Sequence, residues 1–490
     1  MRCPSAVFEE LESRHYTMPV GETDAHNSWV TARFSPHQSQ EHILYLGDDP
    51  GNIGIFDVRK FHDRSVPIEE RQLHFIPAHD GAIMDIVGVP NKEQQIVSIS
   101  GDSTVRCWDL TQSAADRKSE LFYGHEGSVR SICFSPDESN VFATGGRDGK
   151  IKLWDMRVSQ IKKKDLDCRL ATTTYETAHP SSQLEKPAPG TPRSKAKPKY
   201  VPWSVTSVLY LDNYHIATAS SNAESGIRVW DVRMPTRNGE GRPVRTFRIP
   251  TSKGQKTFGV TCMSIDRFGS RIFVSCTNST IFEYATLSAS LEPVNNYSGV
   301  KIGDFYTQVA CSPVADVIAC GSEDNRALMF DLQDQYHYMN DRFLPDEVEK
   351  RRTRFPKYSL GGHEKKVLNV GWSANGKYFM SMDEGGVRIW NEPRHRKAWP
   401  LNEDDPIPAP ETRDLGLSYE QVKPFEMTDP DAAMSCMDSI SISPRQRLGS
   451  VGSSPQKNRG AKRRIVLTSP FKTIGSPRLL NRSPMAKICK

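Results

Sequence analysis

Histidine, a hydroxyl residue, aspartate and tryptophan recur in the same order and at the same spacing in two stretches of this chain. The two sets are His79, Ser98, Asp102 and Trp108, and His125, Thr144, Asp148 and Trp154. Serine, histidine and aspartate perform nucleophilic hydrolysis when the histidine activates the hydroxyl. A nucleophile in every repeat is not expected of an enzyme, whereas a buried hydrogen-bond network repeated in each structural unit is. We therefore interpret both sets as structural, and the sequence predicts no catalytic residue.

Both sets belong to a longer internal repeat. The segments "IVSISGDSTVRCWDL" and "VFATGGRDGKIKLWDM" align without a gap, and each follows a turn with histidine, "AHDG" or "GHEG". The plan returns in "GHEKKVLNVGWSANGKYFMSMDEGGVRIWNE", and four weaker copies bring the number to seven. The units end near Asp57, Asp109, Asp155, Asp231, Glu283, Asp331 and Asn391.

Within each unit, short runs of alternating apolar and polar residues are separated by Gly, Asp, Asn and Ser, which is typical of a four-stranded antiparallel sheet. One such sheet cannot bury both faces, so the units must stack around a ring. The sequence predicts an all-β, seven-bladed WD-repeat β-propeller over residues 28–392. Residues 1–27 form an N-terminal arm that is expected to supply the strand closing the ring.

Two insertions interrupt the predicted ring. Residues 158–203 are rich in Pro, Lys and Ser, which predicts a mobile surface loop, solvated or in contact with nucleic acid. Residues 333–358 contain "DEVEKRR", in which acids precede bases, and this order favours a short exposed helix.

The composition excludes several classes of protein. No apolar run approaches the roughly 20 residues that cross a bilayer, so no membrane association is expected. The ten cysteines are scattered without a Cys-x-x-Cys pair, which argues against a zinc site and a disulfide framework and favours a reducing compartment. No phosphate-binding loop, metal cluster or carboxylate pair stands outside the repeats. The sequence therefore predicts no metal, no cofactor and a protein that is not an enzyme.

Residues 393–490 read as a disordered tail that is first acidic and then basic. Leu401–Asp438 holds ten acidic and two basic residues, whereas residues 443–490 hold twelve Lys or Arg and no acid. The chain before Ser443 therefore carries a net charge of −7, although the total is +5. "KNRGAKRR" predicts nuclear localisation through Lys462, Arg463 and Arg464, or a nucleic-acid patch. The candidate phosphorylation sites are the serines of five Ser-Pro steps, Ser443, Ser454, Ser469, Ser476 and Ser483.

Two neighbouring units end in an Asp-x-Arg pair, "LWDMR" with Asp155 and Arg157 and "VWDVR" with Asp231 and Arg233. Residues i and i+2 share one face of a strand, so each Asp is expected to orient its Arg at the narrow face of the ring. A planar guanidinium presented in this way donates two parallel hydrogen bonds to a partner. The alternative is that Asp-x-Arg is a common strand ending with a solvated Arg. Two pairs in succession favour docking, and "IFDVR" at Arg59 receives less weight.

The segments "FATGGRDGKIKLWDMR", "SVTSVLYLDNYHIATASSNAESGIRVWDVR", "IFVSCTNSTIFEYA" and "GSEDNRALMFDL", in this order, resemble the denticleless family of WD-repeat proteins. The resemblance covers most of residues 28–390. It implies a non-catalytic substrate receptor of cullin-four ubiquitin ligases that acts in the nucleus. Such a receptor binds the ligase adaptor, the large subunit of damaged-DNA-binding protein, here through Asp155, Arg157, Asp231 and Arg233. Its clients are replication and cell-cycle proteins bound to the replication clamp, PCNA, and they are ubiquitylated in S phase or after DNA damage.

The C-terminus departs from the family pattern. Family tails can end in a clamp-binding box, of which Met485 and Ile488 match the first two positions, while the two aromatic positions fall beyond Lys490. The box as it stands is expected to bind the clamp weakly. Either the form is shortened, or recruitment relies on the client's own contact with the clamp.

A second hypothesis is a chromatin- or RNA-associated scaffold. In that case the propeller reads peptides and the basic tail holds nucleic acid. The paired Asp-x-Arg endings favour the receptor, whereas the tail fits both hypotheses.

Overall fold

The computed structural model describes residues 12–17, 28–62, 72–113, 117–163, 166–184, 200–234, 241–251, 257–333, 352–391 and 423–424. All of them lie in one compact unit, Met1–Ile440. Their regular elements are β-strands and three 3-10 turns, η1 (Gln38–Gln40), η2 (Val58–His62) and η3 (Ala223–Ser225). Within these ranges, nothing helical is long and apolar enough to cross a membrane.

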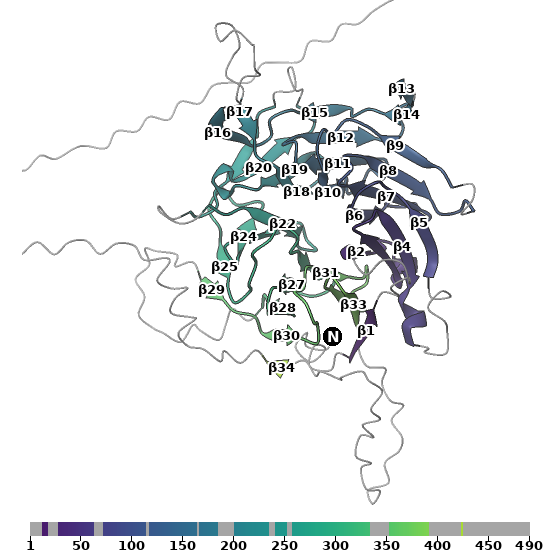
Figure 1. The fold of residues 1–490 in the computed structure, drawn as a ribbon. Helices are drawn as coiled ribbons and strands as arrows, with labels where there is room; N and C mark the ends of the chain where they lie inside the picture. The colour runs from purple at the N-terminus through teal and green to yellow at the C-terminus, as the bar shows by residue number, and fades with distance from the viewer. Residues whose placement is uncertain are drawn as a thin grey trace, which may run out of the picture. The chain divides into compact units, whose positions relative to one another are not determined.

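Seven successive groups of four antiparallel strands form the blades of a propeller (Figure 1), and further strands extend three of these sheets. Blade 1 contains β2 (Trp29–Phe34), β3 (Ile43–Asp48), β4 (Asn52–Asp57) and β5 (Gln72–Pro77). Blade 2 contains β6 (Ile83–Gly88), β7 (Gln95–Ser100), β8 (Val105–Asp109) and β9 (Ser119–Phe122). Blade 3 contains β10 (Val129–Phe134), β11 (Val141–Gly146), β12 (Ile151–Asp155) and β15 (Thr173–Tyr175). Blade 4 contains β18 (Val205–Tyr210), β19 (His215–Ser220), β20 (Ile227–Asp231) and β21 (Arg245–Phe247).

The remaining blades repeat this plan. Blade 5 contains β22 (Val260–Ile265), β23 (Arg271–Cys276), β24 (Thr280–Ala285) and β25 (Asn295–Tyr297). Blade 6 contains β26 (Val309–Cys311), β27 (Val317–Ser322), β28 (Arg326–Asp331) and β30 (Tyr358–Leu360). Blade 7 contains β31 (Asn369–Trp372), β32 (Tyr378–Met382), β33 (Gly386–Asn391) and β1 (Glu12–Thr17). The predicted all-β, seven-bladed propeller is confirmed.

The first strands of the blades line the centre and close the ring. Each packs against the first strand of the next blade, and β31 of blade 7 packs against β2 of blade 1. The outer strand of blade 7 comes from the other end of the chain, because β1 pairs with β33 from Glu12 opposite Asn391 to Thr17 opposite Gly386. The two ends of the repeat region are thus joined by backbone hydrogen bonds.

The apolar core is divided into seven layers, one between each pair of neighbouring blades. Between blades 2 and 3, the Phe122 ring lies edge-on to the rings of Phe142 and Trp154, with centroids 5.2 and 5.7 Å away. Burying each of these side chains contributes roughly 1.5–3 kcal/mol. A single blade would leave both its apolar surfaces in water, so the ring is the smallest unit that buries them.

The ring has two faces that are defined by the ends of the third strands. We call the face where second strands turn into third strands the His–Asp face, because Asp102 and Asp148 occupy these turns. The opposite face, where third strands end at residues such as Asp155 and Asp231, is the Asp-x-Arg face. Because adjacent strands are antiparallel, the turns between first and second strands also lie on the Asp-x-Arg face.

The prediction of a mobile loop over residues 158–203 is wrong for much of that segment. It contains β13 (Ile161–Lys163), β14 (Leu166–Arg169), the outer strand of blade 3, β16 (Pro180–Leu184) and β17 (Tyr200–Pro202). β13 and β14 form a hairpin, and β14 adds in parallel to β9 at the outer edge of blade 2. The free edge of β9 offers backbone partners that the polar composition of this segment does not reveal. Residues 185–199 lie outside the described residues.

The second insertion, residues 333–358, also contributes a strand to the outer edge of a blade. β29 (Arg352–Arg354) adds in parallel to β25 at the outer edge of blade 5. Of the segment predicted to form a helix, "DEVEKRR", residues 346–351 lie outside the described residues. Its last residue, Arg352, begins the strand β29, so the predicted helix is wrong at that end. Of the predicted tail, only β34 (Lys423–Pro424) is described, and it pairs with β30.

Candidate functional site

On the His–Asp face, the predicted histidine sets form closed hydrogen-bond networks. In blade 3, His125 Nδ1 lies 3.0 Å from Asp148 Oδ2, and His125 Nε2 lies 2.8 Å from Thr144 Oγ1. Trp154 Nε1 donates to the same hydroxyl at 2.8 Å. Each network ties the loop before a blade to its second and third strands.

Blade 2 repeats the arrangement. His79 lies 3.0 Å from Asp102 and 2.8 Å from Ser98, and Trp108 donates to Ser98 at 3.0 Å. Ser98 and Thr144 are fully buried, and their hydroxyls are engaged by both a histidine and a tryptophan. A nucleophile must be reachable by a substrate, so these residues cannot act as one.

The aspartates of the networks remain charged. Burial alone would raise the pKa of the Asp102 carboxyl, but the hydrogen bond and charge of His79 and the hydrogen bonds from Thr104 outweigh burial and lower it. The pKa of Asp148 is lowered by the same balance, in which the hydrogen bond from His125 opposes burial. Charged acceptors make these hydrogen bonds stronger than neutral ones.

Two further networks were missed from the sequence. In blade 7, His363 lies 3.1 Å from Asp383 and 2.7 Å from Ser381, to which Trp390 donates. The sequence signal for this network was the "GHE" at the start of the unit, which contains His363. The fourth network, in blade 4, consists of His179, Ser225, Thr218 and Trp230. Here the insertion separates the histidine from its hydroxyl partner by 39 positions and hides the spacing.

The network of blade 4 also lacks the aspartate carboxylate that accepts from the histidine in blades 2, 3 and 7. His179 Nδ1 meets the hydroxyl of Ser225 at 2.9 Å instead. Burial, assisted by the charge of Arg228, lowers the pKa of His179 to about 3. This histidine is therefore neutral at physiological pH.

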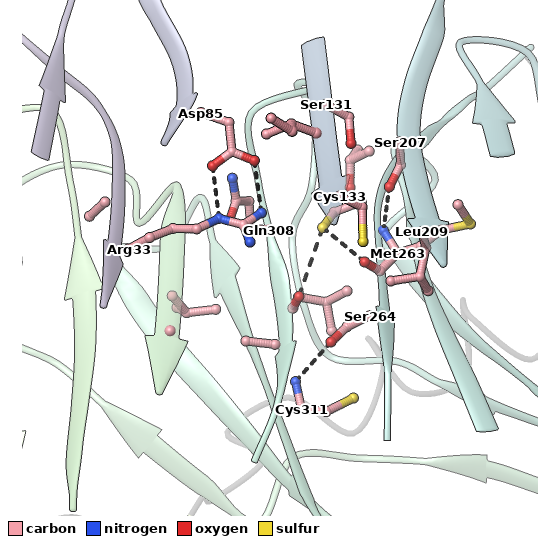
Figure 2. A pocket seen from close by; sticks show the side chains of 18 of the residues that line it. Arg33, Asp85, Ser131, Cys133, Ser207, Leu209, Met263, Ser264, Gln308 and Cys311 are labelled. Carbon is pink, nitrogen blue, oxygen red and sulfur yellow. Dashed lines mark hydrogen bonds and ion pairs between the residues drawn. The ribbon is translucent and has the colours of Figure 1, made fainter. Parts of the chain in front are cut away.

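The centre of the ring encloses a cavity of about 360 Å³ lined by the first strands (Figure 2). Arg33 and Asp85 face each other there, with two N–O distances of 2.8 Å. Hydroxyls of Ser131, Ser207 and Ser264 accept hydrogen bonds from backbone N–H groups of the next blade. The polar groups of the cavity thus join neighbouring blades. Across the described ranges, no group of three or more His, Cys, Asp or Glu is arranged to hold a metal ion, and the seven described cysteines are free.

On the Asp-x-Arg face, each predicted pair forms a fork. Asp155 accepts from Arg157 Nε at 2.9 Å on one oxygen and from Arg157 Nη2 at 2.9 Å on the other. Asp231 does the same for Arg233, at 2.9 and 2.7 Å. Both arginine side chains are 57 % exposed. Each guanidinium is therefore fixed along one edge. On the other edge, Nη1 of Arg157 lies 3.6 Å from the exposed Glu138 carboxylate. Nη1 of Arg233 makes no hydrogen bond or ion pair among the described residues.

The position of each arginine differs from the prediction that it shares a strand face with its aspartate. Both third strands end at the aspartate, so each arginine lies in the following turn. The carboxylate also accepts the backbone N–H of the arginine, at 2.9 Å in Asp155 and 3.0 Å in Asp231. A short Asp side chain favours such a turn over continued strand. The turn, and not strand alternation, therefore orients the arginine.

These contacts also affect the charge of the carboxylates. The hydrogen bond from Arg233 is the main cause that lowers the pKa of Asp231 to about 2. Arg157 lowers the pKa of Asp155 in the same way. Arg233 stacks on the Tyr214 ring, 4.3 Å from its centroid, which further limits its motion.

Arg59, in the third Asp-x-Arg pair of the sequence, has the same geometry. Asp57 accepts from Arg59 Nε at 3.0 Å and from Nη2 at 2.8 Å, and the Arg59 side chain is 57 % exposed. Strand register identifies the matching position in the other described blades, because in each case the last residue of the third strand pairs with the first residue of the second. From blade 1 to blade 6, the residues two positions later are Arg59, Thr111, Arg157, Arg233, Leu287 and Gln333.

The candidate phosphorylation serines from Ser443 to Ser483 and the basic cluster Lys462–Arg464 lie outside the described residues. They stay predictions from sequence.

The fold and its repeated networks define a WD-repeat β-propeller protein. The family model described as "WD domain, G-beta repeat" matches residues 70–109, 117–155 and 354–391. Within this class, the chain is 29 % identical to "Protein lethal(2)denticleless" of Drosophila melanogaster over 76 % of this chain and 45 % of that protein. It is 28 % identical to "Denticleless protein homolog" of Danio rerio over 73 % of this chain and 50 % of that protein.

A third relative is "Cell division cycle protein cdt2" of Schizosaccharomyces pombe, with 28 % identity over 41 % of this chain and 38 % of that protein. The resemblance to the denticleless family of WD-repeat proteins is thereby confirmed. The chain spans about half the length or less of these curated relatives.

Proposed function

We propose that this protein is the substrate-recognition subunit of a cullin-four RING ubiquitin ligase. It is not the catalytic subunit. Its propeller holds the ligase adaptor, the large subunit of damaged-DNA-binding protein, and brings client proteins to the ubiquitin-loaded carrier. The contribution to the reaction is proximity, since tethering raises the effective concentration of client lysines.

One observation carries the proposal, namely the paired arginines of blades 3 and 4. Arg157 and Arg233 are held by carboxylates along one edge. Nη1 of Arg233 makes no hydrogen bond or ion pair among the described residues, and Nη1 of Arg157 lies 3.6 Å from the exposed Glu138 carboxylate, a contact that a partner's acceptor would replace. An arginine that is already oriented loses little conformational entropy when a partner binds. Two such groups on neighbouring blades form a two-point site for carbonyl or carboxylate oxygens.

The finer part of the proposal rests on the family resemblance. We propose that the clients are PCNA-bound replication and cell-cycle proteins and that the protein acts in the nucleus in S phase or after DNA damage. The name of the fission-yeast relative, a cell division cycle protein, supports a role in the cell cycle. Phosphorylation of the Ser-Pro steps would reduce the positive charge of residues 443–490.

The test compares capture of the adaptor from replicating cells by the wild type and by Arg157→Ala/Arg233→Ala. The matched control is Thr111→Ala/Gln333→Ala, which changes the corresponding positions of blades 2 and 6. We expect the arginine variant to lose the adaptor and the control to keep it. Full retention by the arginine variant, or absence of the adaptor from the wild type, would contradict the proposal.

The basic tail favours a second candidate, a chromatin- or RNA-associated scaffold. Its twelve positive charges without an acid predict binding to nucleic acid with a steep salt dependence. The affinity of the full chain for duplex DNA and single-stranded RNA is compared with that of a variant in which Lys462, Arg463 and Arg464 are glutamine. Equal salt slopes would argue against this role for the cluster.

A further inference from the structure

Blade 5 departs from the Asp-x-Arg pattern in a specific way. Ala285 pairs with Arg271, the first residue of β23, just as Asp231 pairs with His215 at the start of β19. Ala285 therefore stands at the aspartate position, and Leu287 stands at the arginine position. Leu287 is 92 % exposed, more than any other exposed large hydrophobic residue in the described ranges.

The backbone on either side of Leu287 is clamped by the neighbouring blade. Arg245, in the outer strand of blade 4, donates from Nη1 to the carbonyl of Thr286 at 2.8 Å and from Nη2 to the carbonyl of Ser288. The hydroxyl of Thr286 donates to the carbonyl of Gly269 at 2.8 Å. Leu287 is thus an apolar side chain on a fixed support, which lowers the entropy lost on binding.

Three other exposed apolar side chains lie on loops of the same face. We define the apolar patch as Met234, Val244, Phe268 and Leu287, which are 58 %, 53 %, 69 % and 92 % exposed. The hydrogen bonds of Arg245 and Thr286 join the loops that carry Val244, Phe268 and Leu287, because Val244 precedes Arg245 and Phe268 precedes Gly269. Met234 directly follows Arg233, so the patch begins where the second Asp-x-Arg pair ends. Exposed apolar side chains that gather on loops of one face mark candidate interaction sites.

We propose that the apolar patch and the guanidinium groups of Arg157 and Arg233 form one docking surface for one partner, the ligase adaptor. This inference rests on the proposed function and extends it to blade 5. The partner surface would carry hydrogen-bond acceptors opposite the arginines and an apolar side chain opposite Leu287. Interfaces combine an apolar centre with oriented Arg side chains in this way.

Charge separates this partner from a second copy of the chain. If two copies met through this face with the Asp-x-Arg pairs at the twofold axis, their guanidinium groups would face one another, and like charges oppose such a pairing. A partner surface that carries acceptor oxygens has no such penalty. The adjacency of Met234 and Arg233 means that a partner covering Arg233 also covers the edge of the patch.

The experiment measures binding of the purified adaptor to the full chain. Leu287→Asp is compared with the wild type, with Arg157→Ala/Arg233→Ala, and with Leu73→Asp, a matched change of an exposed Leu in the outer strand of blade 1. We expect Leu287→Asp to weaken binding at least tenfold and Leu73→Asp to change it less than twofold. Because Leu287 is almost fully exposed, its variant should melt at the wild-type temperature, which a thermal scan checks.

The outcomes separate the two proposals. If the double arginine variant loses the adaptor while Leu287→Asp binds like the wild type, the docking surface ends at blade 4 and the patch proposal fails alone. If the double arginine variant binds like the wild type, or the wild type does not bind, the proposed function fails and the patch proposal with it. Normal adaptor binding by Leu287→Asp with self-association lost would assign the patch to a second copy and overturn the proposal.

Discussion

The two ends of the third strands use aspartate for opposite purposes. At the His–Asp face, Asp148 closes a network whose histidine and threonine are buried, and the network holds the blade together. At the Asp-x-Arg face, Asp155 holds an arginine whose side chain is 57 % exposed. The same carboxylate group stabilises the fold at one end and orients a side chain toward solvent at the other. The difference lies in whether its partner is buried.

The largest expected effect comes from a change at the buried end. Thr144→Val keeps the shape of the side chain but removes the hydroxyl shared by His125 Nε2 and Trp154 Nε1. Each buried polar group left without a partner costs about 1–3 kcal/mol, so for these two groups we expect a loss of about 2–6 kcal/mol. The shift of the urea unfolding midpoint measures it. Arg157→Ala serves as the control from the exposed end, and an equal shift in both variants would refute the contrast.

The second prediction concerns pH and blade 4. His179 has a pKa of about 3 in the folded protein and about 6.5 when unfolded. The unfolded state therefore binds more protons between these values, so the stability contribution is full above about pH 6.5 and decreases as pH falls toward 3. At pH 5.5 the loss is about 1.4 kcal/mol. Urea midpoints at pH 7.5 and 5.5 should differ less in His179→Gln than in the wild type. An unchanged difference would show that another group titrates.

A third prediction tests the fork itself at the exposed end. Arg157→Lys keeps the charge but cannot make two parallel hydrogen bonds with Asp155 and present a second edge outward. We expect adaptor affinity to decrease about fivefold, a loss of about 1 kcal/mol. Titration with the purified adaptor measures it, and the unfolding midpoint should stay at the wild-type value. Wild-type affinity would mean that charge alone is sufficient.

The smallest effect is expected at Arg59. Its geometry equals that of Arg157 and Arg233, but Thr111 separates it from them around the ring. If docking uses neighbouring blades, Arg59→Ala should lower adaptor affinity less than twofold in the same titration. A decrease as large as that of Arg157→Ala would extend the docking surface to blade 1.

The sequence by itself determined the number of repeats and the ring. It also determined both the aspartates of the buried networks and those of the Asp-x-Arg pairs. Local chemistry explains this success, because turns with Asp and Gly and alternating apolar residues act within a few positions of each other. The ends predicted for the repeat units, from Asp57 to Asn391, coincide with the ends of third strands in six of seven blades, with Glu283 two positions inside β24 as the exception.

Only the tertiary structure decided which segments complete the sheets and what occupies the docking face. β14 and β29 became strands because the edges of β9 and β25 were available to them, and no local pattern reports an edge that distant residues supply. In blade 4, Ser225 replaces the aspartate beside His179, and strand register alone aligns Leu287 with Arg157 and Arg233. The backbone that carries Leu287 is held by Arg245 of the neighbouring blade, through hydrogen bonds between residues 41 to 43 positions apart.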